Sequence, residues 1–152
     1  MDTNQKLYNS LKHIQEITKH VTSDWVIIGS AAAHLSGADL MPSDVDFCAS
    51  TGMVARLIGS DIGHNVVKHG QTIFSNPYAT ITPPGGLPID FMGDLSVLSA
   101  GEWKKLEFKS RKKIRFDFGD IYIPEIWEQI AILEMFGRDK DLAKLPLLQA
   151  LL

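Results

Sequence analysis

The apolar residues of the first segment recur every three or four positions, at Leu7, Leu11, Ile14, Ile17 and Val21. This spacing predicts an amphipathic helix, because residues three or four apart share one helix face. Residues 25–28 form a continuous apolar run, which is typical of a strand that is buried on both faces. Residues 31–35 then indicate a short helix that ends at Gly37.

Shorter segments dominate the middle of the chain. Residues 45–49 predict a second strand, and residues 51–60 predict a helix with its apolar residues on one side. Between residues 64 and 92 the apolar pieces are short, and turn residues such as Asn76-Pro77 and 83–86 separate them. This pattern indicates antiparallel strands and hairpins.

The last third of the chain alternates between strand and helix signals. Ser99 and Glu102 have the spacing of a capping box, which predicts a short helix beginning there. Residues 114–118 and 121–123 predict two further strands, and Pro124 suits the first turn of a helix that ends near Phe136. A final helical piece, interrupted by proline, should bury its leucines, which are Leu142, Leu145, Leu148 and Leu151.

These elements predict one domain over residues 1–152, of the α/β (α+β) class. We expect a mixed sheet flanked by helices, with a helical C-terminus. The sheet should begin as strand, helix and strand, and then continue with antiparallel strands. The tryptophans stand at element starts and are expected in the core; they are Trp25, Trp103 and Trp127.

Composition and charge narrow the possible functions. Hydrophobic residues make up 45% of the chain and charged residues 22%, as in ordinary globular proteins. The net charge of -3 argues against a general nucleic-acid binder, and the basic segment 104–115 is interpreted as a solvated hairpin. Cys48 is the one cysteine, which excludes an internal disulfide and suits a buried position. With no signal peptide or membrane-length apolar run, a cytoplasmic protein is expected.

Three short motifs carry candidate chemistry. Gly29-Ser30 joins a buried strand to a helix, where glycine permits close approach of a ligand and helix amides attract phosphate. Asp44 and Asp46 alternate with core residues, so both carboxylates should point to one side of their strand. Asp90 stands inside an apolar run and needs a partner if it is buried. Carboxylates grouped in this way suit Mg²⁺, although each motif alone also fits an ordinary solvated strand or turn.

In their order along the chain, these motifs resemble the nucleotidyltransferase fold of the DNA polymerase beta superfamily. That pattern is a Gly-Ser turn, a short helix, an Asp-x-Asp strand and a third acid on a neighbouring strand. Residues 137–143, with the sequence Gly-Arg-Asp-Lys-Asp-Leu-Ala, are similar to a segment of small bacterial nucleotidyltransferase domains. The resemblance spans roughly residues 25–145.

The resemblance implies a magnesium-dependent transfer reaction. Asp44, Asp46 and Asp90 would be the catalytic carboxylates and would hold two Mg²⁺ ions. Gly29, Ser30 and Lys140 would bind the nucleoside triphosphate, with ATP as the expected donor. A nucleoside monophosphate, expected to be AMP, would pass to a hydroxyl of a small molecule or a macromolecule.

Two alternatives stay open at this stage. In the first alternative, the domain is catalytically degenerate and binds nucleotide or a partner protein without turnover. Lys144 favours this alternative, because relatives often carry an acid at that position. In the second alternative, the domain is a component of a toxin-antitoxin pair. Its apolar tail, residues 145–152, would then pack on another chain. A homo-oligomer formed through the C-terminal helices is a related expectation.

Overall fold

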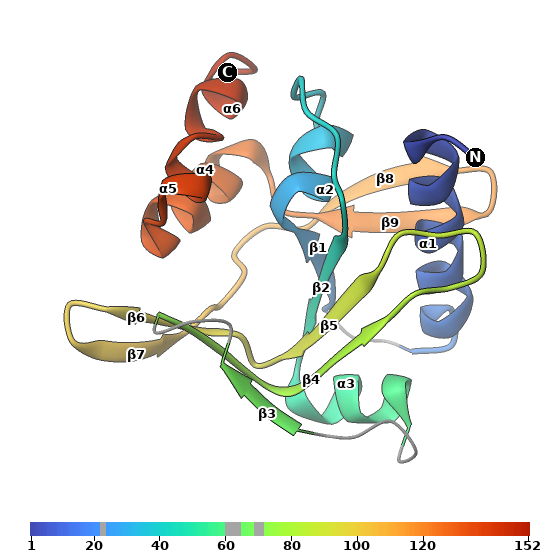
Figure 1. Cartoon of the computed structure of the whole chain (residues 1–152), viewed down its shortest axis with the longest axis horizontal. Coiled ribbons are helices and arrows are strands. Elements are labelled where there is room, and N and C mark those ends of the chain that lie inside the picture. Colours follow the sequence, from blue (N-terminus) through green and yellow to red (C-terminus); the bar gives the residue numbers. More distant parts are fainter. Residues whose placement is uncertain (22–23, 60–64, 69–71) are drawn as a thin grey trace.

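The computed structural model describes residues 1–21, 24–59, 65–68 and 72–152 (Figure 1). Helix α1 (Thr3–Thr18) begins after Asp2, whose side chain accepts a hydrogen bond from the Gln5 amide at 2.8 Å. The predicted first helix is therefore confirmed, and it ends before Val21. Strand β1 (Val26–Ile28) is buried along its length, and helix α2 (Gly29–Leu35) follows without a break.

The central strands follow from the alternation of their side chains. Strands β2 (Val45–Ala49), β4 (Ile73–Ile81) and β5 (Ile89–Gly93) lie next to one another, and β3 (Asn65–Lys68) pairs with β4. Helix α3 (Thr51–Ile58) leads away from β2; the predicted helix reaches Ser60, which lies outside the described residues. The turn predicted at Asn76-Pro77 is wrong, because both residues lie within β4.

Among the described residues, the main sheet has the order β1-β2-β5-β4-β6-β7. β1 pairs antiparallel with β2, whereas β2 pairs parallel with β5. The expectation that the sheet begins with a strand-helix-strand unit is right in order, but the parallel neighbour of β2 is β5 rather than β1. The short helix α2 is the reason, because it turns the chain back along β1 instead of crossing the sheet.

A hairpin replaces the helix that was predicted at Ser99. Strand β6 (Ser96–Ser99) pairs antiparallel with β7 (Glu102–Lys105), and Ser99 lies opposite Glu102. The two residues between them have positive φ angles, 52° at Ala100 and 79° at Gly101. Two-residue hairpin loops favour positive φ at both positions. Ser99 and Glu102, whose spacing predicted a capping box, are therefore the pair of residues that closes a tight turn.

The remaining predicted elements are present, but the strand predicted to reach Phe118 ends at Phe116, and Pro124 precedes the N-cap of the next helix instead of lying in its first turn. Strands β8 (Lys112–Phe116) and β9 (Gly119–Ile123) form a separate antiparallel pair. Helix α4 (Ile126–Phe136) ends at Gly137, which has a φ of 66°. The short helices α5 (Asp139–Leu142) and α6 (Leu145–Gln149) complete the chain. Basic segment 104–115 is not one hairpin, because its ends belong to two different strand pairs.

Apolar side chains cover both faces of the sheet. On one face, Val45 and Phe47 of β2 lie beside Ile89 and Phe91 of β5, beneath α1 and the β8-β9 pair. On the other face, a second cluster including Ile132 of α4 packs against the sheet. Fold class and helical C-terminus therefore match the sequence-based prediction.

Several side chains lie elsewhere than predicted. Trp25 is buried, but Trp103 and Trp127 are about half exposed, at 49% and 54%. Leu142 is exposed at the end of α5, whereas Leu148 is buried against α2 and α4. Cys48 is buried as predicted, and burial together with the charge of Asp46 raises the pKa of its thiol. Within the described part of the chain, no helix is long and apolar enough to cross a membrane.

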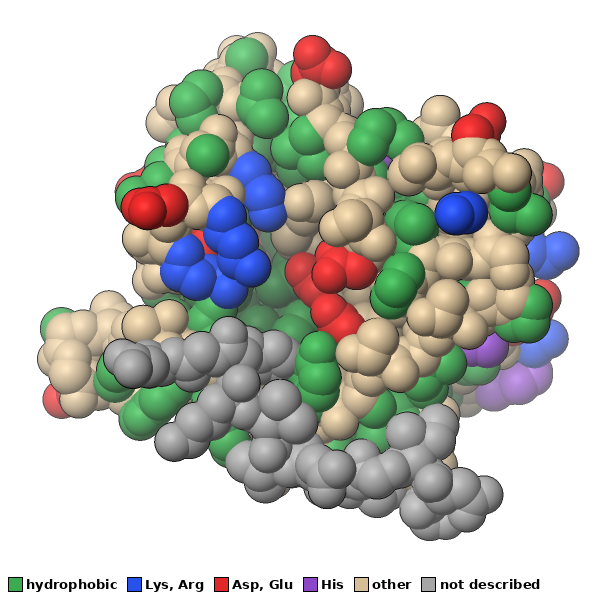
Figure 2. Space-filling view, viewed as in Figure 1, with side chains coloured by type: hydrophobic (Ala, Val, Ile, Leu, Met, Phe, Trp, Pro, Cys, Tyr) green, Lys and Arg blue, Asp and Glu red, His purple; other side chains and the backbone are tan. Residues whose placement is uncertain are grey.

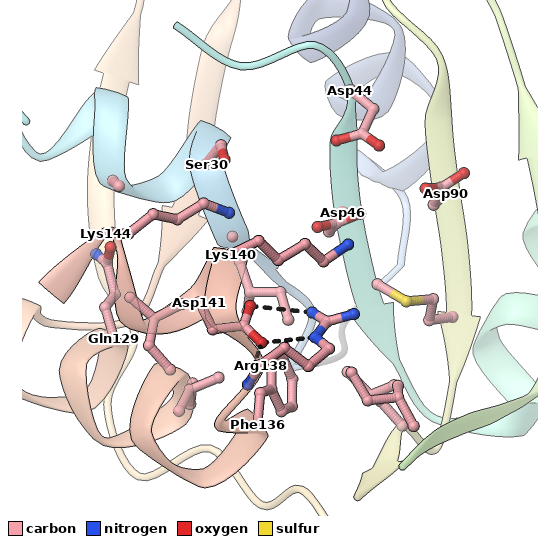
Figure 3. Close-up of a pocket in the computed structure, with 18 of the residues that line it drawn as sticks. Ser30, Asp44, Asp46, Asp90, Gln129, Phe136, Arg138, Lys140, Asp141 and Lys144 are labelled. Carbon is pink, nitrogen blue, oxygen red and sulfur yellow. Dashed lines mark hydrogen bonds and ion pairs between the residues drawn. The ribbon is translucent and has the colours of Figure 1, made fainter. Parts of the chain in front are cut away.

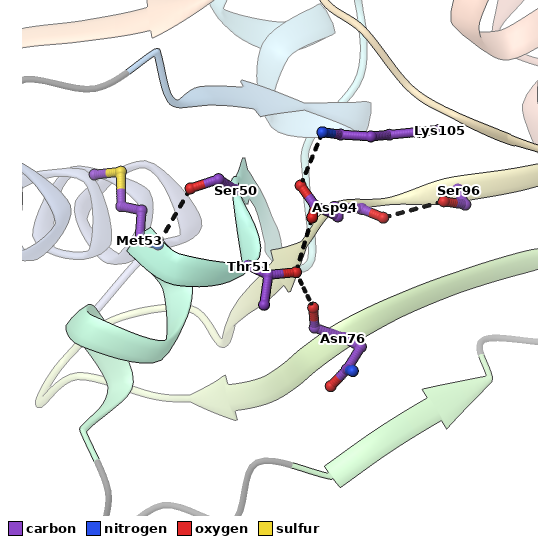
Figure 4. Close-up of polar contacts among 7 residues, drawn as sticks. All are labelled: Ser50, Thr51, Met53, Asn76, Asp94, Ser96 and Lys105. Atoms are coloured by element: carbon purple, nitrogen blue, oxygen red, sulfur yellow. Dashed lines mark hydrogen bonds and ion pairs between the residues drawn. The ribbon is translucent and has the colours of Figure 1, made fainter.

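A polar junction ties α3 to the sheet on the side away from the C-terminal helices (Figure 4). The Thr51 hydroxyl lies 2.6 Å from the carbonyl oxygen of Asn76 and 2.9 Å from Oδ2 of Asp94. Lys105 of β7 forms an ion pair with Asp94 at 3.3 Å. This junction connects α3, β4 and the turn before β6.

Candidate active site

Strand pairing brings three carboxylates to one place on the sheet (Figure 3). Asp46 of β2 lies directly opposite Asp90 of β5 in the parallel register. Asp44 precedes β2 by one residue, on the same side as Asp46. One oxygen from each carboxylate lies within 4.8 Å of the other two. The structure therefore brings together the three acids that the sequence singled out.

Gly29 makes room for one of these acids. A Cβ atom added to Gly29 would lie 2.6 Å from Oδ2 of Asp46, which is closer than real Cβ atoms come. The φ angle of Gly29 is +71°, a conformation that residues with a side chain rarely adopt. Glycine is required here by both space and backbone angle.

Burial and mutual repulsion disfavour the ionised form of two acids. Loss of solvent, and then the charges of Asp44 and Asp90, raise the pKa of Asp46 to about 7. Loss of solvent and the charge of Asp90 also raise the pKa of Asp44. Two ionised carboxylates at this separation repel by about 3 to 4 kcal/mol at an effective dielectric constant of 20. A cation between them would relieve this repulsion.

Cationic side chains form the opposite wall of the site. Lys140 and Lys144 extend from the C-terminal segment toward the acids, and Arg138 lies beneath them (Figure 3). Figure 2 shows these blue side chains facing the red carboxylates across a hollow in the surface. Both lysines lower the pKa values of Asp44 and Asp46, which opposes the larger raising effects.

A buried acid holds Arg138 in place. Asp141 is 2% exposed, and its two oxygens accept hydrogen bonds from Nε of Arg138 at 2.6 Å and from Nη2 at 3.0 Å. The guanidinium also lies 5.4 Å from the ring centroid of Phe136. Such bidentate pairs fix the plane of an arginine strongly. Arg138 is therefore a preorganised cation on the cavity wall.

The hollow between the two walls is a cavity of about 420 Å³. Its polar part lies between the acids and the cations. Its apolar part is lined by side chains of the sheet and of α4, among them Ile73, Met92, Leu95, Ile132 and Phe136. The cavity thus offers metal-ligating, anion-binding and apolar surfaces in one space.

All of the residues that were predicted from the sequence to form the site line this cavity. They are Gly29, Ser30, Asp44, Asp46, Asp90 and Lys140. Helix α2 begins at Gly29 and has no side-chain cap, so the Ser30 hydroxyl does not cap it. Ser30 instead lies in the first turn, at the cavity wall.

Sequence reasoning assigned no role to Lys144 in binding, although its spacing of four residues from Lys140 was a usable signal. It also missed Thr80, whose hydroxyl donates a hydrogen bond to Oδ1 of Asp90 at 2.6 Å. Nothing in the sequence alone pairs Thr80 with Asp90, because the register of β4 and β5 decides this contact.

At the level of sequence, neither a protein-family model nor a curated protein matches this chain. Several solved structures, in contrast, share the fold of this chain. The candidate nucleotidyltransferase TM1012 of Thermotoga maritima is similar over 91% of this chain and 89% of its own, with a TM-score of 0.73 and 18% identity.

Two further structures share the architecture. The lincosamide antibiotic adenylyltransferase LnuA, solved with lincomycin, has a TM-score of 0.55 and 13% identity over 92% of this chain and 94% of its own. An antigenic nucleotidyltransferase-like protein of Paracoccidioides brasiliensis has a TM-score of 0.56 and 14% identity, covering 94% and 75%. This chain therefore has the nucleotidyltransferase fold, as the order of its motifs implied.

Proposed function

We propose that this protein is a metal-dependent nucleotidyltransferase that moves a nucleoside monophosphate, AMP, from a nucleoside triphosphate to a hydroxyl group. One observation carries the proposal. Three carboxylate oxygens within 4.8 Å of one another face Arg138, Lys140 and Lys144 across a cavity. This arrangement suits a polyphosphate that brings its own divalent cations, because both charge signs are then matched.

The donor set fits magnesium. Asp44, Asp46 and Asp90 supply hard oxygen ligands, and burial first, then the charges of the neighbouring acids, raise the pKa values of Asp44 and Asp46. Two Mg²⁺ ions bound by these acids would neutralise them and polarise the phosphate oxygens.

The other residues of the cavity bind and orient the substrate. Lys140, Lys144 and Arg138 attract the triphosphate, and Asp141 keeps Arg138 from turning into solvent. Gly29 and Ser30 lie at the wall beside Asp46, where a phosphate can approach the backbone closely. The apolar part of the cavity excludes water from one side of the site.

In the proposed reaction, the oxygen of the acceptor hydroxyl forms a bond to the α-phosphorus of the nucleotide. The bond between that phosphorus and the oxygen bridging to the β-phosphate breaks, and pyrophosphate leaves with the electron pair. Asp90 activates the hydroxyl as a general base and takes up its proton during the attack. In this proposal the hydroxyl attacks beside the acids, and the leaving pyrophosphate lies beside the cations on the opposite wall of the cavity.

The similarity to LnuA supports adenylyl transfer to a small molecule, because that protein is an adenylyltransferase of lincosamide antibiotics. A partner bound through the C-terminal tail is less well supported. Leu148 is buried, and Leu145, Leu147 and Leu151 pack around it within the same chain.

The experiment compares binding of Mg²⁺-ATP by calorimetry in the wild type and in Asp44→Asn/Asp46→Asn, followed by pyrophosphate release with each nucleotide. The control is Asp39→Asn/Glu102→Gln, which removes two exposed acids that do not line the cavity. We expect binding and pyrophosphate release by the wild type and the control, and neither by the site variant. Binding without pyrophosphate release would favour a degenerate domain, and equal binding by all three proteins would refute the proposed site.

A further inference from the structure

Four side chains form a row across the sheet on the face that carries the acids. Ile28 of β1 lies opposite Asp46 of β2, Asp46 lies opposite Asp90 of β5, and Asp90 lies opposite Thr80 of β4. Directly opposed residues on neighbouring strands have their Cβ atoms about 5 Å apart. Asp90 is therefore held between the charged side chain of Asp46 and the hydroxyl of Thr80.

The hydroxyl of Thr80 binds the outer side of this carboxylate. Thr80 Oγ1 donates a hydrogen bond to Oδ1 of Asp90 at 2.6 Å, a short distance typical of a charged acceptor. The hydroxyl of Tyr78, two residues earlier on the same face of β4, is hydrogen-bonded to Thr80 at 3.2 Å. Both ends of the carboxylate thus have a neighbour, one on β2 and one on β4.

Thr80 stands outside the cavity wall and is exposed. Its hydroxyl is therefore placed to act on Asp90 rather than on the contents of the cavity. The strand supports this, because a β-branched side chain is stiff about χ1 and holds its oxygen in one position. The carboxylate of Asp90, in contrast, is repelled by Asp44 and Asp46, and the hydroxyls of Thr80 and Tyr78 on β4 both bind it against that repulsion.

We propose that Thr80 is a positioning residue, which fixes the orientation of the Asp90 carboxylate beside Asp44 and Asp46 and thereby raises the affinity of this group for divalent cations. The inference rests on the proposed function in one respect, namely that the three acids bind a cation. It goes beyond that function by assigning a residue of a different strand, which contributes no ligand. Partners that orient metal ligands commonly affect metal affinity 10- to 100-fold.

The test uses three variants. Thr80→Val keeps the β-branched shape and removes the hydroxyl, and Thr80→Ser keeps the hydroxyl. Thr51→Val is the matched control, because it also removes a threonine hydroxyl from an aspartate, Asp94, but at the junction of α3 with the sheet (Figure 4), where neither residue lines the cavity. For each protein, Mg²⁺ and Mn²⁺ binding to the metal-free chain is measured by calorimetry. Thermal unfolding is measured in the presence of EDTA.

We expect Thr80→Val to weaken metal binding about tenfold and to leave the unfolding temperature in EDTA unchanged, because the side chain is exposed. Thr80→Ser should retain most of the affinity, and Thr51→Val should retain all of it while lowering the unfolding temperature. The Mg²⁺ concentration that gives half-maximal pyrophosphate release should shift with the binding constant.

Equal metal affinity of wild type and Thr80→Val would overturn the inference, as would equal loss in Thr80→Val and Thr80→Ser. A wild type that binds metal but releases no pyrophosphate would refute the proposed function alone, and the metal affinities of the variants would still decide the role of Thr80. A wild type that binds no metal would overturn both.

Discussion

Gly29 and Asp46 are in such close contact that a Cβ atom on the glycine would lie 2.6 Å from a carboxylate oxygen of the aspartate. The contact joins the first turn of α2 to the second residue of β2. The backbone of the strand-helix junction and the side chain of the Asp-x-Asp strand therefore share one tightly filled space.

Gly29→Ala should therefore damage the site and the fold together. The added methyl group meets Asp46, and the φ of +71° is strained for alanine by about 1 to 2 kcal/mol. We expect lower stability by about 1 to 3 kcal/mol and weaker metal binding, measured by denaturant unfolding and calorimetry. Gly52→Ala is the control, because a Cβ there meets nothing within 4 Å and helix α3 should gain stability. Equal effects of both substitutions would contradict this interpretation.

The pKa of Asp46 near 7 predicts how stability depends on pH in metal-free protein. The folded chain keeps this proton more tightly than the unfolded chain, whose aspartate titrates near 4. Stability should therefore fall as pH rises from about 4 to about 7, and it should change little from this group above that range.

Asp46→Asn removes this titration. In EDTA the variant should be more stable than the wild type at pH 8, by on the order of 2 to 4 kcal/mol, and this advantage should vanish near pH 4. With excess Mg²⁺ at pH 8 the order should reverse, because only the wild type gains stability from the ion. Urea unfolding at several pH values measures both effects, and a pH-independent difference in EDTA would contradict the assigned pKa.

Asp141 should affect nucleotide binding through Arg138. Asp141→Asn removes the charge from a 2% exposed position and weakens the two hydrogen bonds to the guanidinium. We expect a loss of about 1 to 3 kcal/mol in stability, together with weaker Mg²⁺-ATP binding. Asp139→Asn, an exposed acid on the same helix, is the control. If Asp141→Asn binds Mg²⁺-ATP as the wild type does, Asp141 does not act on nucleotide binding through Arg138.

The β6-β7 turn offers a test of the fold that is independent of the site. Ala100 has a φ of 52°, which asparagine tolerates better than alanine in two-residue turns followed by glycine. Ala100→Asn should therefore raise stability by about 0.5 to 1 kcal/mol. Ala131→Asn, in the exposed middle of α4, should lower it because asparagine disfavours helix interiors. Thermal unfolding of both variants checks the contrast.

The sequence predicted the elements that local patterns determine. Helix α1, strand β2 and the end of α4 at Gly137 follow from periodicity, alternation and a terminating glycine. The capping-box prediction at Ser99 failed because the same spacing also closes a two-residue hairpin, and strand pairing decides between them. The turn expected at Asn76-Pro77 failed because the long β4 continues through both residues.

The site, too, was predictable only in part, because strand pairing decides which residues meet there. Gly29 belongs to one short contiguous motif, and Asp44 and Asp46 belong to another. Their proximity in the fold could therefore be predicted from the sequence. The contact of Asp90 with Thr80 depends on the register of two antiparallel strands, which no local pattern reveals. The exposed positions of Trp103 and Trp127 likewise depend on which faces the hairpin and α4 turn toward solvent.

We propose above all that Asp44, Asp46 and Asp90 together hold the divalent cations of a bound nucleoside triphosphate. A crystal structure with Mn²⁺ and a non-hydrolysable ATP analogue is the decisive measurement, because anomalous scattering locates the metal. We expect metal peaks ligated by these three acids, with the triphosphate extending toward Lys140 and Lys144. Metal or triphosphate bound elsewhere on the molecule, with the three acids unligated, would contradict it.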